Sequence, residues 1–391
     1  MRSGLHNGLS EITEGKMTVG KMTVGNRAMG KRAVGNRAFD TAVTGASSAN
    51  ASLPSLSVIV PVHNGGESFQ RCMRALSESV LVTHCCAATA EIEIIVVADG
   101  DSDGSWQLAE EFGTRLIRLP KSKGPAAARN AGAEMATGDL LFFVDADVEV
   151  HLETLLQVMA SFAQDPELAA LIGSYDDAPG DPNFLSQYRN LLHHYTHQVA
   201  QLEASTFWGA CGAIRRHVFK AVDGFDKTYR RPCIEDIELG YRLKQAGYKI
   251  HLRKDIQVKH LKRWTPYSLL RADFFYRALP WTALLLKLQQ SHPVQYRRVM
   301  SDLNLTLRSR FSVMLVYGLL AAVVIAPWFA ASWGVAALLG LALTVLNFSV
   351  YDFFRQKHGL LFALKTVPWH WLYFLYSGLA YAIGQCRHRF A

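Results

Sequence analysis

The stretch LLFFVDAD, residues 140–147, joins five consecutive apolar residues to two acidic ones, Asp145 and Asp147. An apolar run of this length predicts a strand that is buried on both faces of a sheet. Two carboxylates directly after such a strand contribute nothing to a hydrophobic core. Hard divalent cations, however, prefer oxygen ligands and often complete their shell with substrate phosphates. A short acidic pair is also compatible with ordinary loop residues, so its meaning depends on the rest of the chain.

Three further apolar runs precede this stretch, at residues 57–62, 93–97 and 114–119. Each is followed by a polar cluster and then by a helix-like segment, at residues 67–81, 105–113 and 125–137. Strands and helices that alternate in this way predict a mostly parallel, Rossmann-like α/β sheet with helices on both faces. Ligands of such sheets bind beyond the carboxyl ends of the strands, where these polar clusters lie.

Four segments of the chain resemble the family 2 glycosyltransferases of the GT-A fold. They are PVHN (61–64), VVADGDSDGS (96–105), GPAAARNAGAEMATGDLLFFVDAD (124–147) and IEDIELGYRLKQAGY (234–248). The resemblance covers roughly residues 55–265 and implies an inverting hexosyltransferase that uses a nucleotide-sugar. The second motif departs from the family, which usually has Asp and Ser where this chain has Ala98 and Asp101.

The resemblance implies which residues bind the nucleotide-sugar. Matching the motifs residue by residue gives Pro61, Asn64, Asp99, Arg129 and Asp145. Asp99 occupies the position that contacts the nucleobase, and a carboxylate there accepts from the imide N–H of uracil, which favours a UDP-sugar. Arg129 is a planar donor suited to a phosphate or a base edge; the alternative is an exposed helix arginine.

A metal site is expected at the end of the acidic stretch. Asp147 is expected to bind Mg²⁺ or Mn²⁺, with Asp145 near both the metal and the ribose. The cation would neutralise charge that builds on the departing diphosphate. His260, after the strand-like residues 256–259, is either a structural histidine or a third metal ligand.

Glu235 and Asp236 precede a predicted helix at residues 237–246. Acids at a helix N-terminus also offset the helix dipole, which is a purely structural explanation. Sugar transfer to a hydroxyl needs a base, and a positioned carboxylate provides one. The resemblance assigns that role to Asp236, with Glu235 supporting it or orienting the acceptor. One base opposite the leaving group implies direct displacement and inversion.

The composition indicates both water-facing and membrane-facing parts. Of the 391 residues, 50% are hydrophobic, and the formal net charge is +8. The basic balance favours proximity to anionic lipid, and no nucleic-acid motif accompanies it. The six cysteines have no metal-like spacing and predict free thiols. Residues 15–39 repeat with a period of five, so residues 1–52 are expected to form a disordered basic repeat tail without a secretory signal.

Two uncharged stretches near the C-terminus, residues 311–332 and 333–351, are each long enough to cross a membrane core of about 30 Å. A tight turn is expected at residues 332–334. Residues 367–384 are a third candidate, which their hydropathy favours. A third crossing would, however, place Arg387 and Arg389 on the outer side of the membrane, against the positive-inside rule. Basic residues precede the first span, at Lys287, Arg297, Arg298, Arg308 and Arg310. The positive-inside rule then predicts a multi-pass protein of the inner (plasma) membrane with a cytoplasmic catalytic domain.

The predicted organisation is therefore a tail (1–52), a GT-A domain (53–265), interfacial helices (266–310) and a transmembrane region (311–391). The predicted function is sugar transfer from a nucleotide-sugar to a lipid-linked or membrane-proximal hydroxyl acceptor. One alternative is a polyprenyl-phosphate sugar transferase, whose acceptor needs no strong base. Another is a non-catalytic membrane protein that binds a nucleotide-sugar. This alternative predicts that other residue types replace the acidic residues of the site, but Asp99, Asp145, Asp147 and Asp236 are all present.

Overall fold

The structure is a computed structural model that describes residues 53–291, 293 and 306–390. These residues belong to one compact unit, residues 51–391. The predicted repeat tail, residues 1–52, lies outside the described residues.

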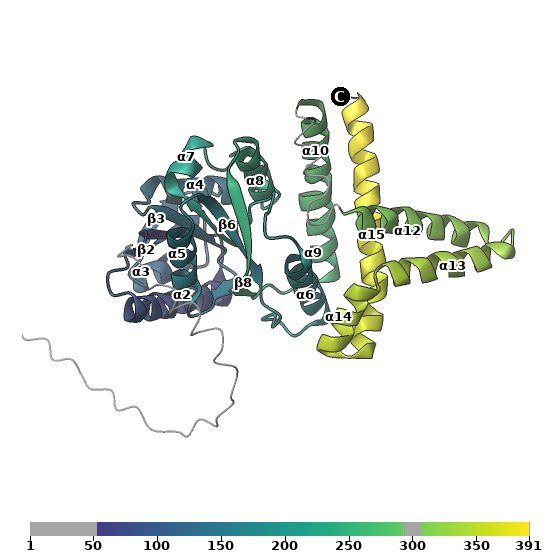
Figure 1. Ribbon diagram of the computed structural model, residues 1–391, viewed down its shortest axis with the longest axis horizontal. Coiled ribbons are helices and arrows are strands. Elements are labelled where there is room, and N and C mark those ends of the chain that lie inside the picture. Colours follow the sequence, from purple (N-terminus) through teal and green to yellow (C-terminus); the bar gives the residue numbers. More distant parts are fainter. Residues whose placement is uncertain (1–52, 292, 294–305, 391) are drawn as a thin grey trace, which may run out of the picture. The chain divides into compact units, whose positions relative to one another are not determined.

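A mixed eight-stranded sheet carries the candidate site (Figure 1), in the order β3-β2-β1-β4-β7-β6-β8-β5. The strands are β1 (Leu56–Val62), β2 (Ile92–Asp99), β3 (Arg115–Leu119), β4 (Leu140–Val144), β5 (Val148–Val150), β6 (Leu168–Tyr175), β7 (Cys211–Arg215) and β8 (Lys249–His260). Strands β1 to β4 pair in parallel, as do β6 and β8. Strand β7 runs antiparallel to β4 and β6, and β5 runs antiparallel to β8. The predicted α/β class is confirmed.

Helices cover both faces of the sheet. They are α2 (Gly66–Cys86), α3 (Ser105–Glu111), α4 (Pro125–Met135), α5 (Thr154–Gln164), α6 (Phe184–Val199), α7 (Arg216–Ala221) and α8 (Glu235–Gln245). Strand β4 is completely buried, and its side chains alternate between two cores, as a period of two requires. Phe142 packs with α2 and α5, whereas Phe143 packs with α4 and α8. The apolar run of the sequence thus contributes to both cores at once.

Two elements differ from the sequence-based prediction. No strand is expected from the sequence within residues 151–205, but they contain the buried strand β6. Its sequence, LAALIGSY, is apolar throughout, and a short apolar run does not distinguish a buried strand from a buried helix. Strand β8 extends over twelve residues, well beyond the predicted residues 256–259.

A second group of helices follows the sheet. It comprises α9 (Pro266–Arg271), the π-helix η1 (Ala272–Ala278), α10 (Leu279–Ser291), α12 (Leu307–Ile325), α13 (Ala331–Leu346), α14 (Phe348–His358) and α15 (Leu360–Phe390). Helix α6 packs against this group, because Tyr188 and Leu191 share a buried cluster with Val350, Phe354 and Ala363. Lys357 also forms an ion pair with Asp177.

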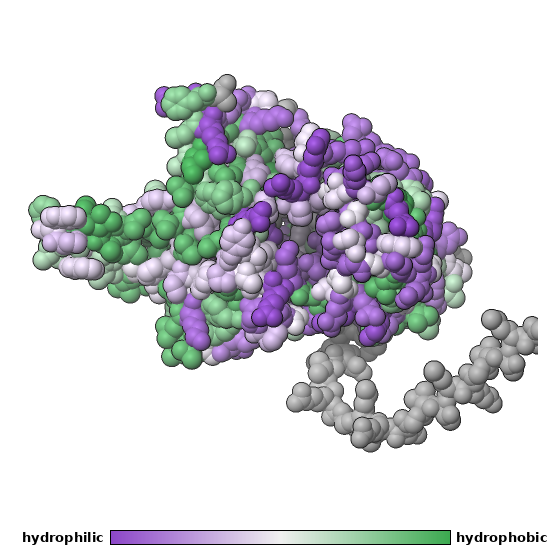
Figure 2. Space-filling model, turned by 180° about the vertical axis from the view of Figure 1, so that it is seen from behind, coloured by the Kyte–Doolittle hydropathy of each residue, from purple (hydrophilic) through white to green (hydrophobic). Residues whose placement is uncertain are grey.

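One described helix, α12, is long and apolar enough to cross a membrane, and the pair α13–α14 qualifies as a second span if its 66° bend lies within one crossing. Exposed apolar residues cover α12 and α13 (Figure 2), among them Met314, Val324, Leu338 and Leu341. The turn between the two helices lies at residues 326–330, so the predicted turn at residues 332–334 is wrong. The third candidate, residues 367–384, lies inside α15, which does not meet the same test.

Candidate active site

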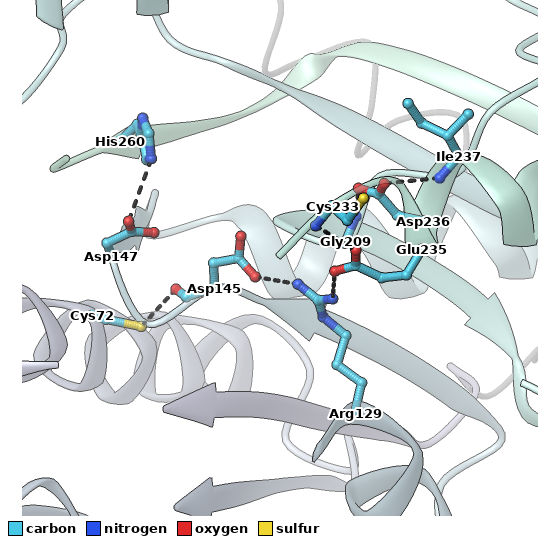
Figure 3. A network of polar contacts seen from close by, with 10 residues as sticks. All are labelled: Cys72, Arg129, Asp145, Asp147, Gly209, Cys233, Glu235, Asp236, Ile237 and His260. Carbon is cyan, nitrogen blue, oxygen red and sulfur yellow. Dashed lines mark hydrogen bonds and ion pairs between the residues drawn. The ribbon is translucent and has the colours of Figure 1, made fainter. Parts of the chain in front are cut away.

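The two acids of the opening stretch lie in the turn between β4 and β5. The backbone N–H of Val148 donates to the carbonyl oxygen of Asp145 at 3.1 Å, which closes this turn. The side chains of Asp145 and Asp147 are 34% and 32% exposed, so about two-thirds of each is already removed from water. The turn therefore presents both carboxylates at the carboxyl end of the buried strand β4 (Figure 3).

Arg129, on α4, links this turn to α8. Its Nη2 donates to Asp145 Oδ1 at 2.6 Å and its Nη1 donates to Glu235 Oε1 at 2.9 Å (Figure 3). The guanidinium group is buried, and a Cβ atom on Gly209 would come within 2.9 Å of its Cζ. Only glycine at position 209 lets the backbone pass so close to Arg129.

The electrostatics of Arg129 keep it permanently charged. Burial alone would lower the pKa of Arg129, but the charges of Asp145, Glu235 and Asp236 outweigh it and raise that pKa. Among the described residues, its buried Nε has no hydrogen-bond partner. The arrangement is a fixed cation that holds two carboxylates from distant parts of the chain.

Asp236 is the half-buried carboxylate at the start of α8. Its Oδ2 accepts from the backbone N–H of Gly209 at 3.1 Å and its Oδ1 accepts from that of Ile237 at 2.8 Å. Burial, reinforced by the charge of Glu235, raises the pKa of Asp236 to about 6. Glu235 is held more tightly, since its Oε2 also accepts from the N–H of Cys233 at 2.9 Å. Asp236 has the pKa of a group that can exchange protons near neutral pH.

His260 ends β8 beside Asp147. Its Nε2 lies 3.6 Å from Asp147 Oδ2, and its Nδ1 lies 2.7 Å from Asn190 Oδ1. The imidazole ring also stacks on Tyr175, with ring centroids 4.5 Å apart. Burial acts to raise the pKa of Asp147, but His260 and Lys262 outweigh it and lower that pKa to about 2. Asp147 is therefore fully ionised at neutral pH.

The expected metal ligands do not form one three-residue cluster. No group of three or more His, Cys, Asp or Glu side chains in the described ranges is placed to share a metal ion. Asp147 and His260 are neighbours, whereas Asp145 turns to Arg129. Asp145 and Asp147 nevertheless fit a hard cation as a pair, because both are partly exposed carboxylates on one short turn.

Asp99 lies at the end of β2, with its carboxylate buried. It accepts from Ser122 Oγ at 2.8 Å and from the backbone N–H groups of Lys123 and Gly124 at 2.7 and 2.9 Å. An ionised carboxylate has about four lone-pair sites, so one acceptor position remains for a base. Asp99 thus also fixes the loop before α4, a role that the sequence did not suggest.

The other expected nucleotide contacts lie at the ends of β1 and β2. Asn64, with a φ of 54°, accepts through Oδ1 from the backbone N–H of Ser102 at 2.8 Å. Pro61 is a half-buried residue of β1, aligned with Val97 of β2. These residues belong to the same edge of the sheet as Asp99, but no described contact joins them to the group around Arg129.

Sequence reasoning missed Asn190 and Tyr175, which hold His260 in place. Tyr175 was missed because β6 was not predicted, and Asn190 because it is one polar position on an otherwise amphipathic helix. A strand prediction for residues 168–175 would have placed Tyr175 near the site. Tyr175 is the last residue of that strand and so lies at the edge of the sheet where the site is found.

Comparisons with known proteins agree with this geometry. Residues 57–223 match the family model of glycosyl transferase family 2, and residues 189–264 match that of an N-terminal domain of galactosyltransferase. Glycosyltransferase AglE of Haloferax volcanii is 34% identical over 110 residues, which are 27% of this chain and 34% of that protein. The pre-mycofactocin glycosyltransferase of Mycobacterium tuberculosis is 26% identical over 216 residues, 52% of this chain and 42% of the other. The chain thus spans about a third to a half of such relatives.

A solved structure supports the architecture. The mannosyltransferase PcManGT from Pyrobaculum calidifontis, in complex with GDP-Man and Mn²⁺, matches with a TM-score of 0.54 and 17% identity. The match covers 88% of this chain and 93% of the other. The predicted GT-A fold is confirmed. Residues 57–223 therefore form a domain that matches glycosyl transferase family 2.

Proposed function

We propose that this protein is a membrane-bound, inverting glycosyltransferase that moves a sugar from a UDP-sugar to a lipid-linked or membrane-proximal hydroxyl acceptor. The observation that carries the proposal is that Arg129 forms two ion pairs, with Asp145 at 2.6 Å and with Glu235 at 2.9 Å. They join the end of β4 to the start of α8, where Asp236 lies. Relatives named as glycosyltransferases support the reaction class.

Asp236 is the proposed base. Its raised pKa leaves it mostly ionised at neutral pH yet basic enough to take a proton. It removes the proton of the acceptor hydroxyl while that oxygen attacks the anomeric carbon. The bond to the nucleotide diphosphate breaks on the opposite side, which inverts the configuration. Glu235 and Arg129 are proposed as positioning residues, because their mutual ion pair fixes the first turn of α8.

Asp145 and Asp147 are proposed to hold Mg²⁺ or Mn²⁺ together with the donor phosphates, with His260 as a further ligand beside Asp147. Such an ion supplies charge neutralisation at the leaving diphosphate. The lowered pKa of Asp147 supports this assignment, since a metal ligand must be deprotonated. The Mn²⁺ in the complex of the Pyrobaculum protein is consistent with it.

The donor is proposed to bind along the ends of β1, β2 and β4. Asp99 has one acceptor position left for the uracil imide, and Pro61 and Asn64 lie at the neighbouring end of β1. The raised pKa of Asp236 favours a hydroxyl acceptor over a polyprenyl phosphate, because a phosphate is already ionised and needs no base. Helix α12 supports membrane attachment, and we propose a multi-pass inner-membrane protein with its catalytic domain in the cytoplasm.

Replacement of the base gives the direct test. Asp236→Asn should lower kcat by about 10²–10⁴-fold, the usual contribution of a general base. Calorimetric binding of UDP in the presence of Mn²⁺ should stay within error of the wild type. The matched control is Asp223→Asn, the same chemical change at an exposed position, which should leave both unchanged. Near-normal turnover by Asp236→Asn would refute the assignment.

A further inference from the structure

We infer that a groove between α9–η1 and α15 binds the hydrocarbon chain of a phosphate-bearing membrane lipid. The groove encloses about 370 Å³, within the range of about 300–1,000 Å³ that is typical of ligand sites. Its apolar walls are formed by Tyr267, Leu270, Phe274, Phe275, Leu372 and Leu379. The inference deepens the proposed function and rests on it, because such a lipid would be the anchor of the lipid-linked hydroxyl acceptor and not the acceptor itself.

The groove lies between two helical faces that do not fill the space between them. On α9–η1, the lining residues recur at intervals of three and four, from Tyr267 through Leu270 to Phe274. On α15, Leu372 and Leu379 are seven residues apart and so lie on one face as well. Tyr267 and Phe275 remain 71% and 58% exposed. Aromatic surface of this kind is stable in contact with lipid and costly in contact with water.

Another side of α15 packs against α12, the candidate membrane span. The hydroxyl group of Tyr317 on α12 donates to the carbonyl oxygen of Leu375 at 2.8 Å. A Cβ atom on Gly378 would lie 2.5 Å from the ring of Tyr317, so the two helices are in close contact there. Because one helix forms both the groove and the contact with α12, the groove lies beside the candidate membrane span.

Arg271 gives the groove its charge. It is an exposed lining residue, and its guanidinium lies 5.8 and 5.6 Å from the rings of Tyr267 and Tyr276. No ion pair of Arg271 with a carboxylate occurs in the part of the chain that the structure describes. The nearby carboxylate of Asp273 is already engaged by other groups. A guanidinium in this position favours a phosphate.

Asp273 closes the inner side of the groove. It is buried and bonded to Arg189 at 3.1 Å, to Arg277 at 2.8 Å and to the hydroxyl group of Tyr376, whose ring also lines the groove, at 2.6 Å. These contacts join α6, η1 and α15 at one point. The π-helix η1 therefore has a fixed place between the groove and the catalytic domain.

The helices that line the groove also contact α8. Trp281, three residues beyond η1, donates through Nε1 to the hydroxyl group of Tyr241 at 2.9 Å. Tyr241 lies on the helix that begins with Glu235 and Asp236. A lipid held by its chain in the groove would therefore rest against elements that also carry the proposed base.

The test uses the full chain in dodecyl maltoside micelles, which contain no phosphate, without any nucleotide-sugar. The probe is farnesyl phosphate with a terminal diazirine, and the comparison probe is the corresponding farnesol. After irradiation, peptide mass spectrometry should find the label on residues 267–275 and 372–379. Leu379→Trp, which fills the groove from a position that is 47% exposed, should lower this labelling about tenfold. Leu364→Trp, on the same helix and 58% exposed, is the matched control.

A second pair of variants tests the charge. Arg271→Gln should reduce the preference for the phosphate probe over the alcohol about tenfold, as expected for a charge-assisted hydrogen bond. Lys365→Gln should not. Label spread evenly over α12 and α13, or equal loss in the Leu379 and Leu364 variants, would overturn the groove assignment. Normal labelling in a protein without sugar transfer would instead contradict the proposed function alone, so the two failures are distinguishable.

Discussion

At the scale of single residues, Arg129 shows what a local pattern cannot reveal. The sequence left open whether this arginine binds a ligand or lies exposed on a helix, and the structure shows it buried between two carboxylates. One of them, Glu235, is 106 residues away in the sequence. Periodicity and motif spacing carry no information on such a contact, which exists only because the end of β4 and the start of α8 lie close together.

Asp147 carries a prediction about metal-dependent binding. Asp147→Asn should weaken UDP-sugar binding at least about tenfold in the presence of Mn²⁺, since even residues that only support a metal ligand contribute about 10–100-fold. Without metal, the variant and the wild type should bind alike. Isothermal titration with and without Mn²⁺ measures both. Asp223→Asn again provides the control, and overlapping Mn²⁺ titrations of Asp147→Asn and the wild type would exclude the metal role.

Asp236 carries a prediction about pH. Its pKa of about 6 means that it is protonated below pH 6 and cannot accept the acceptor proton there. The rate kcat/KM should therefore rise about tenfold per pH unit up to about pH 6 and level off above it. Glu235→Gln should move the break to lower pH, because the charge of Glu235 helps to raise the pKa of Asp236. A wild-type break near the ordinary aspartate value would count against Asp236 as the base.

At the scale of elements, strands β1 to β4 could be predicted and β6 could not. Strands β1 to β4 lie where their apolar runs predict them, and β1, β2 and β3 are each followed by the predicted helix. Strand β6 was missed because a short, fully buried apolar run does not by itself distinguish a strand from a helix. The resemblance to family 2 glycosyltransferases predicted the site residues of the loops. Their partners Tyr175 and Asn190 could be found only from the packing of β6, α6 and β8.

At the scale of the whole molecule, the predicted boundary at residue 265 can be tested. Helix α6 packs through Tyr188 and Leu191 against α14 and α15, and each such side chain contributes roughly 1.5–3 kcal/mol when buried. A fragment of residues 53–265 should therefore unfold at a lower temperature than the full chain and associate in solution. Scanning calorimetry and light scattering measure the two effects.

Leu192, in the same buried cluster, provides the control. In the fragment, Leu192→Glu should reduce association because the exposed face becomes polar. In the full chain, the same substitution should lower stability because a charge is then buried. A fragment that is monomeric and as stable as the full chain would show that the catalytic domain folds independently of α14 and α15.

The π-helix η1 has a consequence for how this chain tolerates change in length. A π-helix holds more residues per turn than the α-helix on either side of it. The wider turn takes up one extra residue, so removing a single residue from Ala272–Ala278 should restore a continuous α-helix and leave α9 and α10 in nearly the same relative orientation. Removing a residue from the regular turns of α10 would instead rotate η1 by about 100° relative to the rest of that helix. Asp273 would then face away from Arg189, and Phe274 would face away from α15. This chain should therefore tolerate a one-residue deletion within η1 better than one within α10.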